Sequence, residues 1–263
     1  MDLGLKDRVA LVTASSKGLG AATAREFARE GAQVIMCARS GDLLAERAKE
    51  IEEETGSKPA VVEADLTRRT DIERVVGTVR DTYGRLDALF INAGGPPPGV
   101  FEDLEDSAWE AAVELTLMSA VRLARAALPM MREQGEGSIL ACTSVSVKQP
   151  VDGLMLSNAL RMGVTGMLKT LAGEVGPAGI RVNMILPGWT KTQRAVNLLK
   201  SRAEKAGTTP ETEETKLTSG VPLRRMGRPE EFARTAVFLS SPAASYITGV
   251  SMLVDGGIYK GSL

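Results

Sequence analysis

Short apolar runs rich in β-branched residues alternate along the chain with longer amphipathic stretches. The apolar runs are RVALVT (8–13), AQVIMC (32–37), PAVVEA (59–64), LDALFI (86–91), SILACT (138–143), IRVNMIL (180–186) and VSMLVD (250–255). Between them lie stretches with helical spacing of apolar residues, as in 19–30 and 107–134. Continuous apolar strands that alternate with helices are typical of a parallel sheet covered on both faces. The pattern predicts a single-domain, doubly wound α/β fold of seven strands over residues 1–263, with its ligand crevice beyond the carboxyl ends of the strands.

Composition and charge narrow the class of protein. The formal net charge is −1 and no basic run stands out, which argues against a nucleic-acid groove. The apolar runs are far shorter than a bilayer span, and the charged N-terminus MDLGLKDR does not resemble a signal peptide. Cys37 and Cys142 lie inside apolar runs, where buried free thiols are expected. We therefore expect a cytoplasmic protein that binds neither nucleic acid nor membrane.

The chain contains no histidine. Histidine is the commonest general acid–base residue and a frequent metal ligand, so both roles would fall to other side chains. No cluster of cysteines and histidines exists either, and we expect no catalytic metal.

The first apolar run leads into a glycine-containing turn, VTASSKGLG (12–20), at the start of a helix. Backbone N–H groups at a helix start, together with the hydroxyls of Ser15 and Ser16, are suited to bind a phosphate. The full G-x-G-x-x-G spacing is absent, so an ordinary turn that needs glycine for its backbone is the alternative.

The second apolar run ends in MCARS (36–40). A carboxylate at this strand end would bind the ribose 2′-hydroxyl of NAD, whereas an arginine suits the 2′-phosphate of NADP. Position 38 is alanine, Arg39 follows it, and Lys17 in the first turn offers a second positive charge. The alternative is that Arg39 is an ordinary exposed arginine. Its position in the predicted crevice favours NADP.

Two further strand ends carry polar residues. Asp65 in EADLT (63–67) is placed either to accept from an adenine amino group or to cap the next helix. In LPGWTKT (186–192), Thr190 and Thr192 offer hydroxyls to a polar ligand, and a helix N-cap at Thr192 is the alternative.

The stretch INAGGPPPG (91–99) comes directly after a buried strand. Its glycines allow close approach of a ligand to the backbone, and its three prolines stiffen the second half of the stretch. We interpret it as a wall facing the cofactor, continued by a rigid rim of the substrate pocket.

Together these motifs resemble the short-chain dehydrogenase/reductase family, and in particular its 3-oxoacyl-carrier-protein-reductase-like members. The resemblance runs from about residue 5 to about residue 258 and includes NAG (92–94), PG (187–188), RMGRPEE (225–231) and SSPAASYITGVSMLVDGG (240–257). It implies a Rossmann-type fold, NADP(H) as cofactor and a small-molecule carbonyl or alcohol substrate. It also implies a homotetramer, or a homodimer, paired through two long helices near 107–134 and 157–176 and the C-terminal region.

The candidate cofactor site combines the residues that the resemblance carries over with those chosen from the strand ends. It comprises Thr13, Ser15, Ser16, Lys17, Gly18, Leu19, Arg39, Asp65, Leu66, Asn92, Ala93, Gly94, Arg161, Pro187, Gly188, Thr190 and Thr192. The family pattern T-G-x-x-x-G-x-G carries Ala14 in place of its first glycine here. A methyl group in a tight turn strains it or narrows the approach of the pyrophosphate. Gly18 and Gly20 remain, so we expect cofactor binding to survive.

The family's catalytic asparagine, serine, tyrosine and lysine fall on Thr116, Ser144, Ser157 and Arg161, so only the serine is kept. A serine hydroxyl is a much poorer acid than tyrosine, and arginine stays protonated and cannot shuttle a proton. Arginine can still donate hydrogen bonds to ribose hydroxyls or to a developing oxyanion. Structural alternatives are a helix N-cap for Ser157 and, for Arg161 one turn later, a bond to the loop beneath.

Two classes of function are consistent with this sequence. One is an NADP-dependent oxidoreductase with a non-standard active site, in which water supplies the proton. The other is a non-catalytic NADP(H)-binding or scaffold protein that has lost the tyrosine–lysine pair. The charged segment 191–220 lies where the family places its substrate lid, and a surface loop is its alternative. The kept Ser144 and this segment favour the oxidoreductase.

Overall fold

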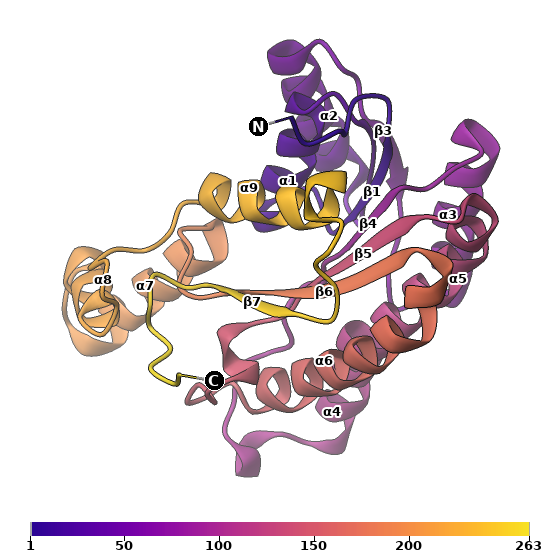
Figure 1. Cartoon of the computed structure of the whole chain (residues 1–263). Coiled ribbons are helices and arrows are strands. Elements are labelled where there is room, and N and C mark those ends of the chain that lie inside the picture. Colours follow the sequence, from indigo (N-terminus) through magenta and orange to yellow (C-terminus); the bar gives the residue numbers. More distant parts are fainter. Residues whose placement is uncertain (1, 263) are drawn as a thin grey trace.

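Seven parallel strands form one sheet with the order β3-β2-β1-β4-β5-β6-β7 (Figure 1). This computed structural model describes residues 2–262. The strands are β1 (Val9–Thr13), β2 (Gln33–Ala38), β3 (Ala60–Glu63), β4 (Ala88–Ile91), β5 (Gly137–Cys142), β6 (Ile180–Pro187) and β7 (Ser251–Val254). Each strand falls on one of the apolar runs in the sequence, so the predicted doubly wound α/β fold is confirmed.

Helices cover both faces of the sheet. They are α1 (Gly18–Arg29), α2 (Gly41–Thr55), α3 (Arg69–Tyr83), α4 (Asp106–Ala112), α5 (Ser119–Gln134), α6 (Met155–Val175), α7 (Gln193–Ala206), α8 (Pro210–Thr218) and α9 (Pro229–Ser240). Short helical turns are η1 (Phe101–Asp103), the π-helix η2 (Val113–Met118), η3 (Val145–Val147), η4 (Gly176–Ala178) and η5 (Pro242–Ala244). Helices α1, α2 and α9 share a core with one face of the sheet, and α3, α5 and α6 share a core with the other.

The central strands are apolar at consecutive positions because both of their faces are buried. In β1, Leu11 packs into the core beneath α3, α5 and α6, while its neighbour Val12 packs into the core beneath α1, α2 and α9. In the second core, the fully buried rings of Phe90 and Phe232 meet edge to face with centroids 6.2 Å apart. Both layers are therefore anchored to the central strands, whose carboxyl ends carry the candidate site.

The order of the strands reverses between β1 and β4, because β2 lies on one side of β1 and β4 on the other. Doubly wound sheets bind ligands beyond the carboxyl ends of the strands at such a point. The Oγ1 atom of Thr13 donates to the Asn92 carbonyl at 2.7 Å and accepts from the Asn92 N–H at 2.8 Å. This pair of bonds fixes the end of β1 against the residue that comes after β4.

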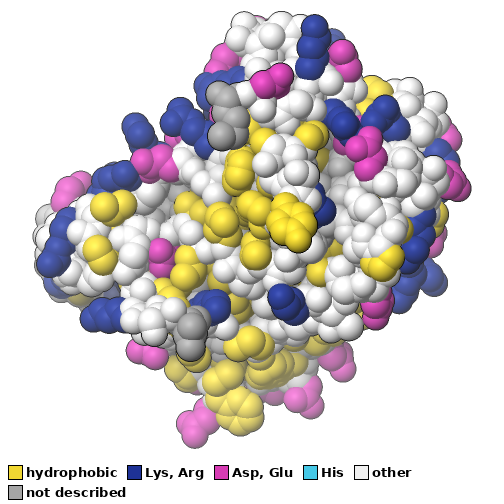
Figure 2. Space-filling view, viewed as in Figure 1, with side chains coloured by type: hydrophobic (Ala, Val, Ile, Leu, Met, Phe, Trp, Pro, Cys, Tyr) yellow, Lys and Arg dark blue, Asp and Glu magenta, His cyan; other side chains and the backbone are white. Residues whose placement is uncertain are grey.

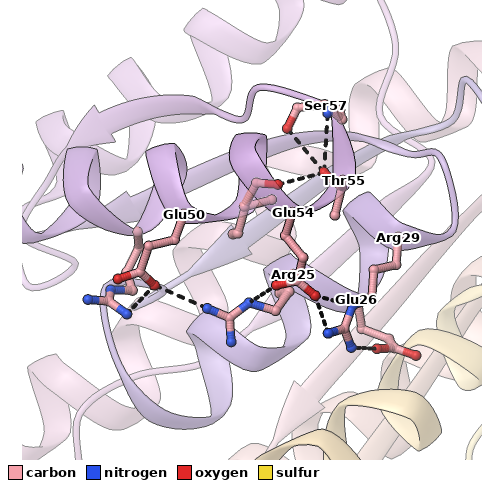
Figure 3. Close-up of polar contacts among 9 residues, drawn as sticks. Arg25, Glu26, Arg29, Glu50, Glu54, Thr55 and Ser57 are labelled. Carbon is pink, nitrogen blue, oxygen red and sulfur yellow. Dashed lines mark hydrogen bonds and ion pairs between the residues drawn. The ribbon is translucent and has the colours of Figure 1, made fainter.

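Ion pairs hold α2 against α1 (Figure 3). The Nη2 atom of Arg25 lies 3.2 Å from a Glu50 carboxylate oxygen, and the Nε atom of Arg29 lies 2.8 Å from a Glu54 carboxylate oxygen. These side chains are partly exposed, so each pair contributes well under about 1 kcal/mol on its own.

The predicted helical stretch 107–134 is confirmed, because α4, η2 and α5 follow one another without a break, although the middle part η2 is a π-helix, which buries Thr116. One alternative for α6 was wrong. Ser157 does not cap α6, since the helix begins at Met155 and its flanking residue is Leu154. The hydroxyl of Ser157 instead lies inside the first turn and accepts from Arg161.

The charged segment 191–220 is not a surface loop, because it contains α7 and α8. Thr192 is the N-cap of α7, and its Oγ1 atom accepts from the Ala195 N–H at 3.4 Å. The two helices form a lobe at one side of the sheet (Figure 1). No helix within residues 2–262 is both long and apolar enough to span a bilayer.

Candidate cofactor site and active site

The turn after β1 is closed tightly around one carbonyl. A Cβ added to Gly20 would lie 2.4 Å from the Ala14 carbonyl oxygen, and the Asn92 side-chain amide donates to the same oxygen at 3.4 Å. Gly18 has φ +57° and Ala14 has φ +48°, so both adopt left-handed backbone. That conformation costs a residue with a Cβ about 1 kcal/mol. The strain expected from Ala14 is therefore present, while Gly18 and Gly20 keep the turn compact.

Three residues of this turn face different surroundings. Ser15 is fully buried, and both its N–H and its hydroxyl donate to the Cys37 carbonyl, at 3.1 and 3.3 Å. It therefore fastens the turn to the end of β2. Ser16 is half-buried and Lys17 is exposed at the start of α1, so these two are the side chains that the turn offers to a phosphate.

Arg39 and Asp65 lie near each other where β2 and β3 end. Arg39 is exposed, and Leu66 beside Asp65 is buried. The Oδ1 atom of Asp65 accepts from the Thr67 N–H at 3.0 Å and from the Thr67 hydroxyl at 2.8 Å. The Thr67 N–H is the largest cause that lowers the pKa of Asp65, and the charge of Arg39 lowers it further. Asp65 thus closes a turn before α3 and does not cap that helix, which begins at Arg69.

The segment after β4 forms one wall of the crevice. Asn92, Ala93 and Gly94 come directly after the buried strand, and a Cβ on Gly94 would meet no atom within 4 Å. The backbone at Gly94 is therefore open to close approach by a ligand. At Gly95 the situation differs, because a Cβ there would lie only 2.0 Å from the Nη1 atom of Arg194.

The segment after β6 forms a facing wall. Pro187 ends β6, and a Cβ on Gly188 would lie 2.7 Å from the Asp255 Cα, so the close packing on the chain after β7 requires glycine there. Thr190 is buried and leads to Thr192 at the start of α7.

Arg161 is bonded to the carboxyl end of β5. Its Nη1 atom donates to the Cys142 and Thr143 carbonyls at 2.9 and 3.1 Å, and its Nε atom donates to the Ser157 hydroxyl at 3.2 Å. The expected bond to the loop beneath is confirmed. The Nη2 atom has no hydrogen-bond partner within residues 2–262. Burial is the main cause that lowers the pKa of Arg161, and the charge of Arg194 lowers it further, but a guanidinium stays protonated at working pH.

Both cysteines are buried free thiols, as the sequence predicts. Burial raises the pKa of Cys142 to about 11 and that of Cys37 to about 12. Cys142 is therefore a neutral neighbour of Arg161 and no thiolate pairs with the guanidinium.

Ser144 lines a cavity of about 380 Å³ beyond the ends of β5 and β6. The other lining residues are Val145, Gln149, Pro150, Val151, Asp152, Leu154, Pro187, Gly188, Trp189 and Ile258. Ser144 caps the turn η3, its hydroxyl accepting from the Ser146 N–H at 3.1 Å, and can still donate its own proton. No tyrosine, lysine or cysteine is among the lining residues, so the cavity wall carries none of the weak acids whose ordinary pKa lies between about 8 and 11.

Three buried hydroxyls near these residues have no hydrogen-bond partner within the described chain. They are Thr116 on η2, which packs on α6, and Thr143 and Ser146, which flank Ser144. Buried polar atoms without a protein partner are typical positions for ordered water. Sequence reasoning singled out Thr116 but missed Thr143 and Ser146, although CTSVS (142–146) is rich in hydroxyls. Within residues 2–262 there is no group of acidic, cysteine or histidine side chains that could hold a metal ion.

A family model described as enoyl-(acyl carrier protein) reductase matches residues 13–259. The chain is 33% identical over 257 residues to the 3-oxoacyl-[acyl-carrier-protein] reductase FabG of Thermotoga maritima, covering 97% of this chain and 98% of that protein. It is also 33% identical over 254 residues to the human dehydrogenase/reductase SDR family member 4, covering 96% and 88% of the two chains.

Solved structures of reductases are also similar to this chain over nearly its whole length. L-sorbose reductase from Gluconobacter frateurii, complexed with NADPH and L-sorbose, superimposes with a TM-score of 0.96 at 35% identity over 99% of this chain and all of that one. An actinorhodin polyketide ketoreductase with NADPH superimposes with a TM-score of 0.91 at 32% identity, covering 96% and 97% of the two chains.

Proposed function

The chain belongs to the short-chain dehydrogenase/reductase family, and we propose that it is an NADP(H)-dependent oxidoreductase whose active site uses Ser144, Ser157 and Arg161. The family model and the relatives that match this chain are reductases, which supports an oxidoreductase activity. The proposal adds the cofactor, the carbonyl or alcohol substrate and the roles of these three residues in a site without tyrosine and lysine.

The fit of the cofactor rests on the crevice between the ends of β1 and β4. The compact turn at Gly20 and the start of α1 offer backbone N–H groups to a diphosphate. Open space at Gly94 allows a flat ring to approach the backbone. Arg39 and Lys17, both exposed at this edge, suit a 2′-phosphate, and the similar sorbose reductase and polyketide ketoreductase were solved with NADPH.

The observation that carries the proposed chemistry is the attachment of Arg161 to β5. Its bonds to Cys142 and Thr143 hold a permanent cation directly beside Ser144. Bound NADPH would supply the hydride. The Ser144 hydroxyl would donate a hydrogen bond to the carbonyl oxygen, and the charge of Arg161 would stabilise the oxyanion that develops there. Water delivers the proton that tyrosine gives elsewhere in the family.

This arrangement predicts a slow enzyme. A missing general acid costs about 10²- to 10⁴-fold in rate, whereas orientation of the reactants is retained. The test is NADPH oxidation against a panel of ketones, aldehydes and 3-oxoacyl esters. We expect Arg161→Met to lower kcat about 10²-fold, the size of one lost oxyanion donor, while NADPH binding persists.

A double variant tests the same mechanism in the opposite direction. Ser157→Tyr with Arg161→Lys restores an acid and its partner four residues apart on one face of α6. Activity on a generic 3-oxoacyl ester should rise by up to about 10²-fold at saturating NADPH. A folded double variant that binds NADPH and remains inert would count against the reductase.

The second candidate function is a non-catalytic NADP(H)-binding or scaffold protein. One observation favours it, namely that no residue lining the cavity is an effective proton donor near neutral pH. This candidate predicts tight NADPH binding with no oxidation by any carbonyl compound. It also predicts no response to Arg161→Met beyond folding stability.

We further propose that α7 and α8 form a substrate lid and that the protein is a homotetramer, or a homodimer, paired through α5, α6 and the C-terminal region. Hydrophobic side chains gather over the face that carries β7 and α9 (Figure 2), and Tyr246 is fully exposed. Such apolar surface is typical of a contact between subunits. Light scattering of the purified protein gives the number of subunits, and a monomer would refute the assembly.

A further inference from the structure

The chain after β7 supplies part of the wall of the cavity that Ser144 lines. Ile258 is partly buried and lines this cavity, although it lies beyond Val254, the last residue of the strand. This end of the chain runs beside the lobe of α7 and α8 (Figure 1). The cavity is therefore bounded in part by a short segment outside the helix that carries Ser157 and Arg161.

Asp255 folds this segment into a tight turn. Its Oδ1 atom accepts from the Gly257 N–H at 2.9 Å, and its Oδ2 atom accepts from the Tyr259 N–H at 2.9 Å. Ile258 lies between these two residues, so the same carboxylate holds its neighbours on both sides. An asparagine would have one acceptor oxygen in place of two, because its amide nitrogen only donates. The position of Ile258 therefore depends on the Asp255 carboxylate.

The turn is packed closely against two other parts of the chain. A Cβ on Gly188, which also lines the cavity, would lie 2.7 Å from the Asp255 Cα. A Cβ on Gly256 would lie 2.8 Å from the Cγ1 atom of Val221, a buried residue that follows α8. The turn thus joins the wall after β6 to the segment after the proposed lid, and these contacts fix the place of Ile258.

The chemistry of the wall indicates what lies against Ile258. The wall is mostly apolar and includes Val145, Val151, Leu154 and Trp189. Among the described residues that line the cavity there is no arginine or lysine, and the charged one is the exposed Asp152. An anionic substituent against this wall would lose hydration without gaining a cation. The cavity of about 380 Å³ is small for a ligand site, so a few carbon atoms in its wall decide what fits.

We propose that Ile258 limits the length of an uncharged, apolar substituent of the substrate, and that Asp255 is a positioning residue that holds Ile258 in place. The inference rests on the proposed function, because it names the substrate class of the same cavity. That class is a ketone whose carbonyl lies at Ser144 and whose apolar chain lies against the wall. Ile258 contacts the chain and not the reacting carbonyl, so it determines specificity.

The experiment measures binding to protein saturated with NADP⁺, so that no reduction can occur. Methyl ketones from 2-butanone to 2-nonanone, each longer than the last by a methylene, are titrated by calorimetry. Ile258→Ala removes the ethyl and methyl groups of the side chain, and Ile258→Phe enlarges it. Ile247→Ala is the matched control, because Ile247 is also partly buried but packs on the core beneath α1, α2 and α9 and does not line the cavity. NADP⁺ affinity is measured separately for each protein.

In the wild type, each added methylene should tighten binding about fourfold until the chain fills the cavity, and longer ketones should then bind no better. Ile258→Ala should move that limit upward by about two carbon atoms, Ile258→Phe should move it downward, and Ile247→Ala should not change it. The anion 5-oxohexanoate should bind the wild type at least about 10-fold more weakly than 2-heptanone. NADP⁺ affinity should stay the same throughout.

Three results overturn the inference. The first is a length limit that is the same in the wild type, Ile258→Ala and Ile258→Phe. The second is the absence of any gain in affinity with chain length. The third is 5-oxohexanoate that binds as tightly as 2-heptanone.

Asp255→Asn tests the positioning role. A looser turn should let ketones beyond the wild-type limit bind more tightly. In the Ile258→Ala background the same change should not move the limit further, because the side chain that Asp255 positions is gone. A change that weakens all ketones by the same factor in both backgrounds would show that Asp255 only stabilises the fold, and overturns its positioning role.

Failure of the proposed function has a different signature. A protein whose length limit follows Ile258 but that never oxidises NADPH with any ketone has the apolar cavity and is not a reductase. A protein that oxidises NADPH with ketones of every length, whatever residue stands at position 258, is a reductase without the proposed wall.

Discussion

Replacing Gly20 with alanine tests the cofactor turn at its most crowded point. The new Cβ would lie 2.4 Å from the Ala14 carbonyl oxygen and 3.0 Å from the Asn92 side-chain nitrogen. An ordinary contact between carbon and oxygen is about 3.3 Å, so the two atoms must separate by about 0.9 Å. The Ala14 backbone is already left-handed and bonded to Asn92, so it cannot absorb that movement without losing the bond.

The expected cost of Gly20→Ala is about 1–3 kcal/mol in the free energy of unfolding, the usual range for overpacking. Displacement of the turn by nearly 1 Å also misplaces the N–H groups offered to the diphosphate. Loss of one such charge-assisted bond lowers NADPH affinity by about 10- to 100-fold. Urea denaturation gives the stability, and quenching of intrinsic fluorescence gives the NADPH affinity.

Gly77→Ala is the matched control for the same chemical change. Gly77 lies inside α3 with no atom within 4 Å of an added Cβ. Alanine there should stabilise the protein by up to about 1 kcal/mol through helix propensity and leave NADPH affinity unchanged. If Gly20→Ala is as stable as the wild type and binds NADPH equally well, our account of the turn is wrong.

Three further predictions concern the turn, the core and the cofactor. Ala14→Gly should raise the free energy of unfolding by about 0.5–1 kcal/mol in urea denaturation, because glycine tolerates φ +48°; a loss of stability would contradict this. Burial would raise the pKa of Asp87, but its bonds to Arg85, to the Val9 N–H and to Arg8 outweigh burial and lower it. Asp87→Asn should therefore lower the free energy of unfolding by about 3 kcal/mol at pH 7. The difference between wild type and variant should shrink as the pH falls below about 4 towards the folded-state pKa of Asp87. A difference that does not change with pH would refute the assignment. Arg39→Ala should remove a preference for NADPH over NADH of about 10-fold or more, measured by calorimetry, and equal affinities of the wild type for both cofactors would defeat the 2′-phosphate assignment.

The hydrophobic pattern was sufficient for the architecture because the central strands are buried on both faces, and the edge strands β3 and β7 still carry apolar runs although they are partly exposed. The contact between Arg161 and Ser157 was also predictable, since the two residues lie one helical turn apart on α6, whereas the bond of Arg161 to the Cys142 carbonyl depends on how α6 packs beside β5. The π-helix around Thr116 was not predictable, because a single inserted residue leaves the helical spacing of apolar residues almost intact.

Residues that depend on tertiary proximity were missed for a common reason. The contact between Gly95 and Arg194 joins two walls of the crevice that are distant in sequence, and neither segment contains a motif for it. Ser15 is a residue that the sequence singled out but whose hydroxyl has another partner. Its type and position suit a phosphate, but its hydroxyl donates to the Cys37 carbonyl. Only the arrangement of β2 beside β1 decides where that hydroxyl lies.

The most direct test of the central claim is the fate of the cofactor's hydride. Wild-type protein is incubated with NADPH that carries deuterium at C4 in either configuration, together with each carbonyl compound of the panel, and the product is examined by mass spectrometry. Our account predicts one deuterium on the former carbonyl carbon of the product, from one of the two labelled cofactors only, and a lower yield in Arg161→Met. Tight NADPH binding without any deuterium in the product would contradict the account and leave the non-catalytic function.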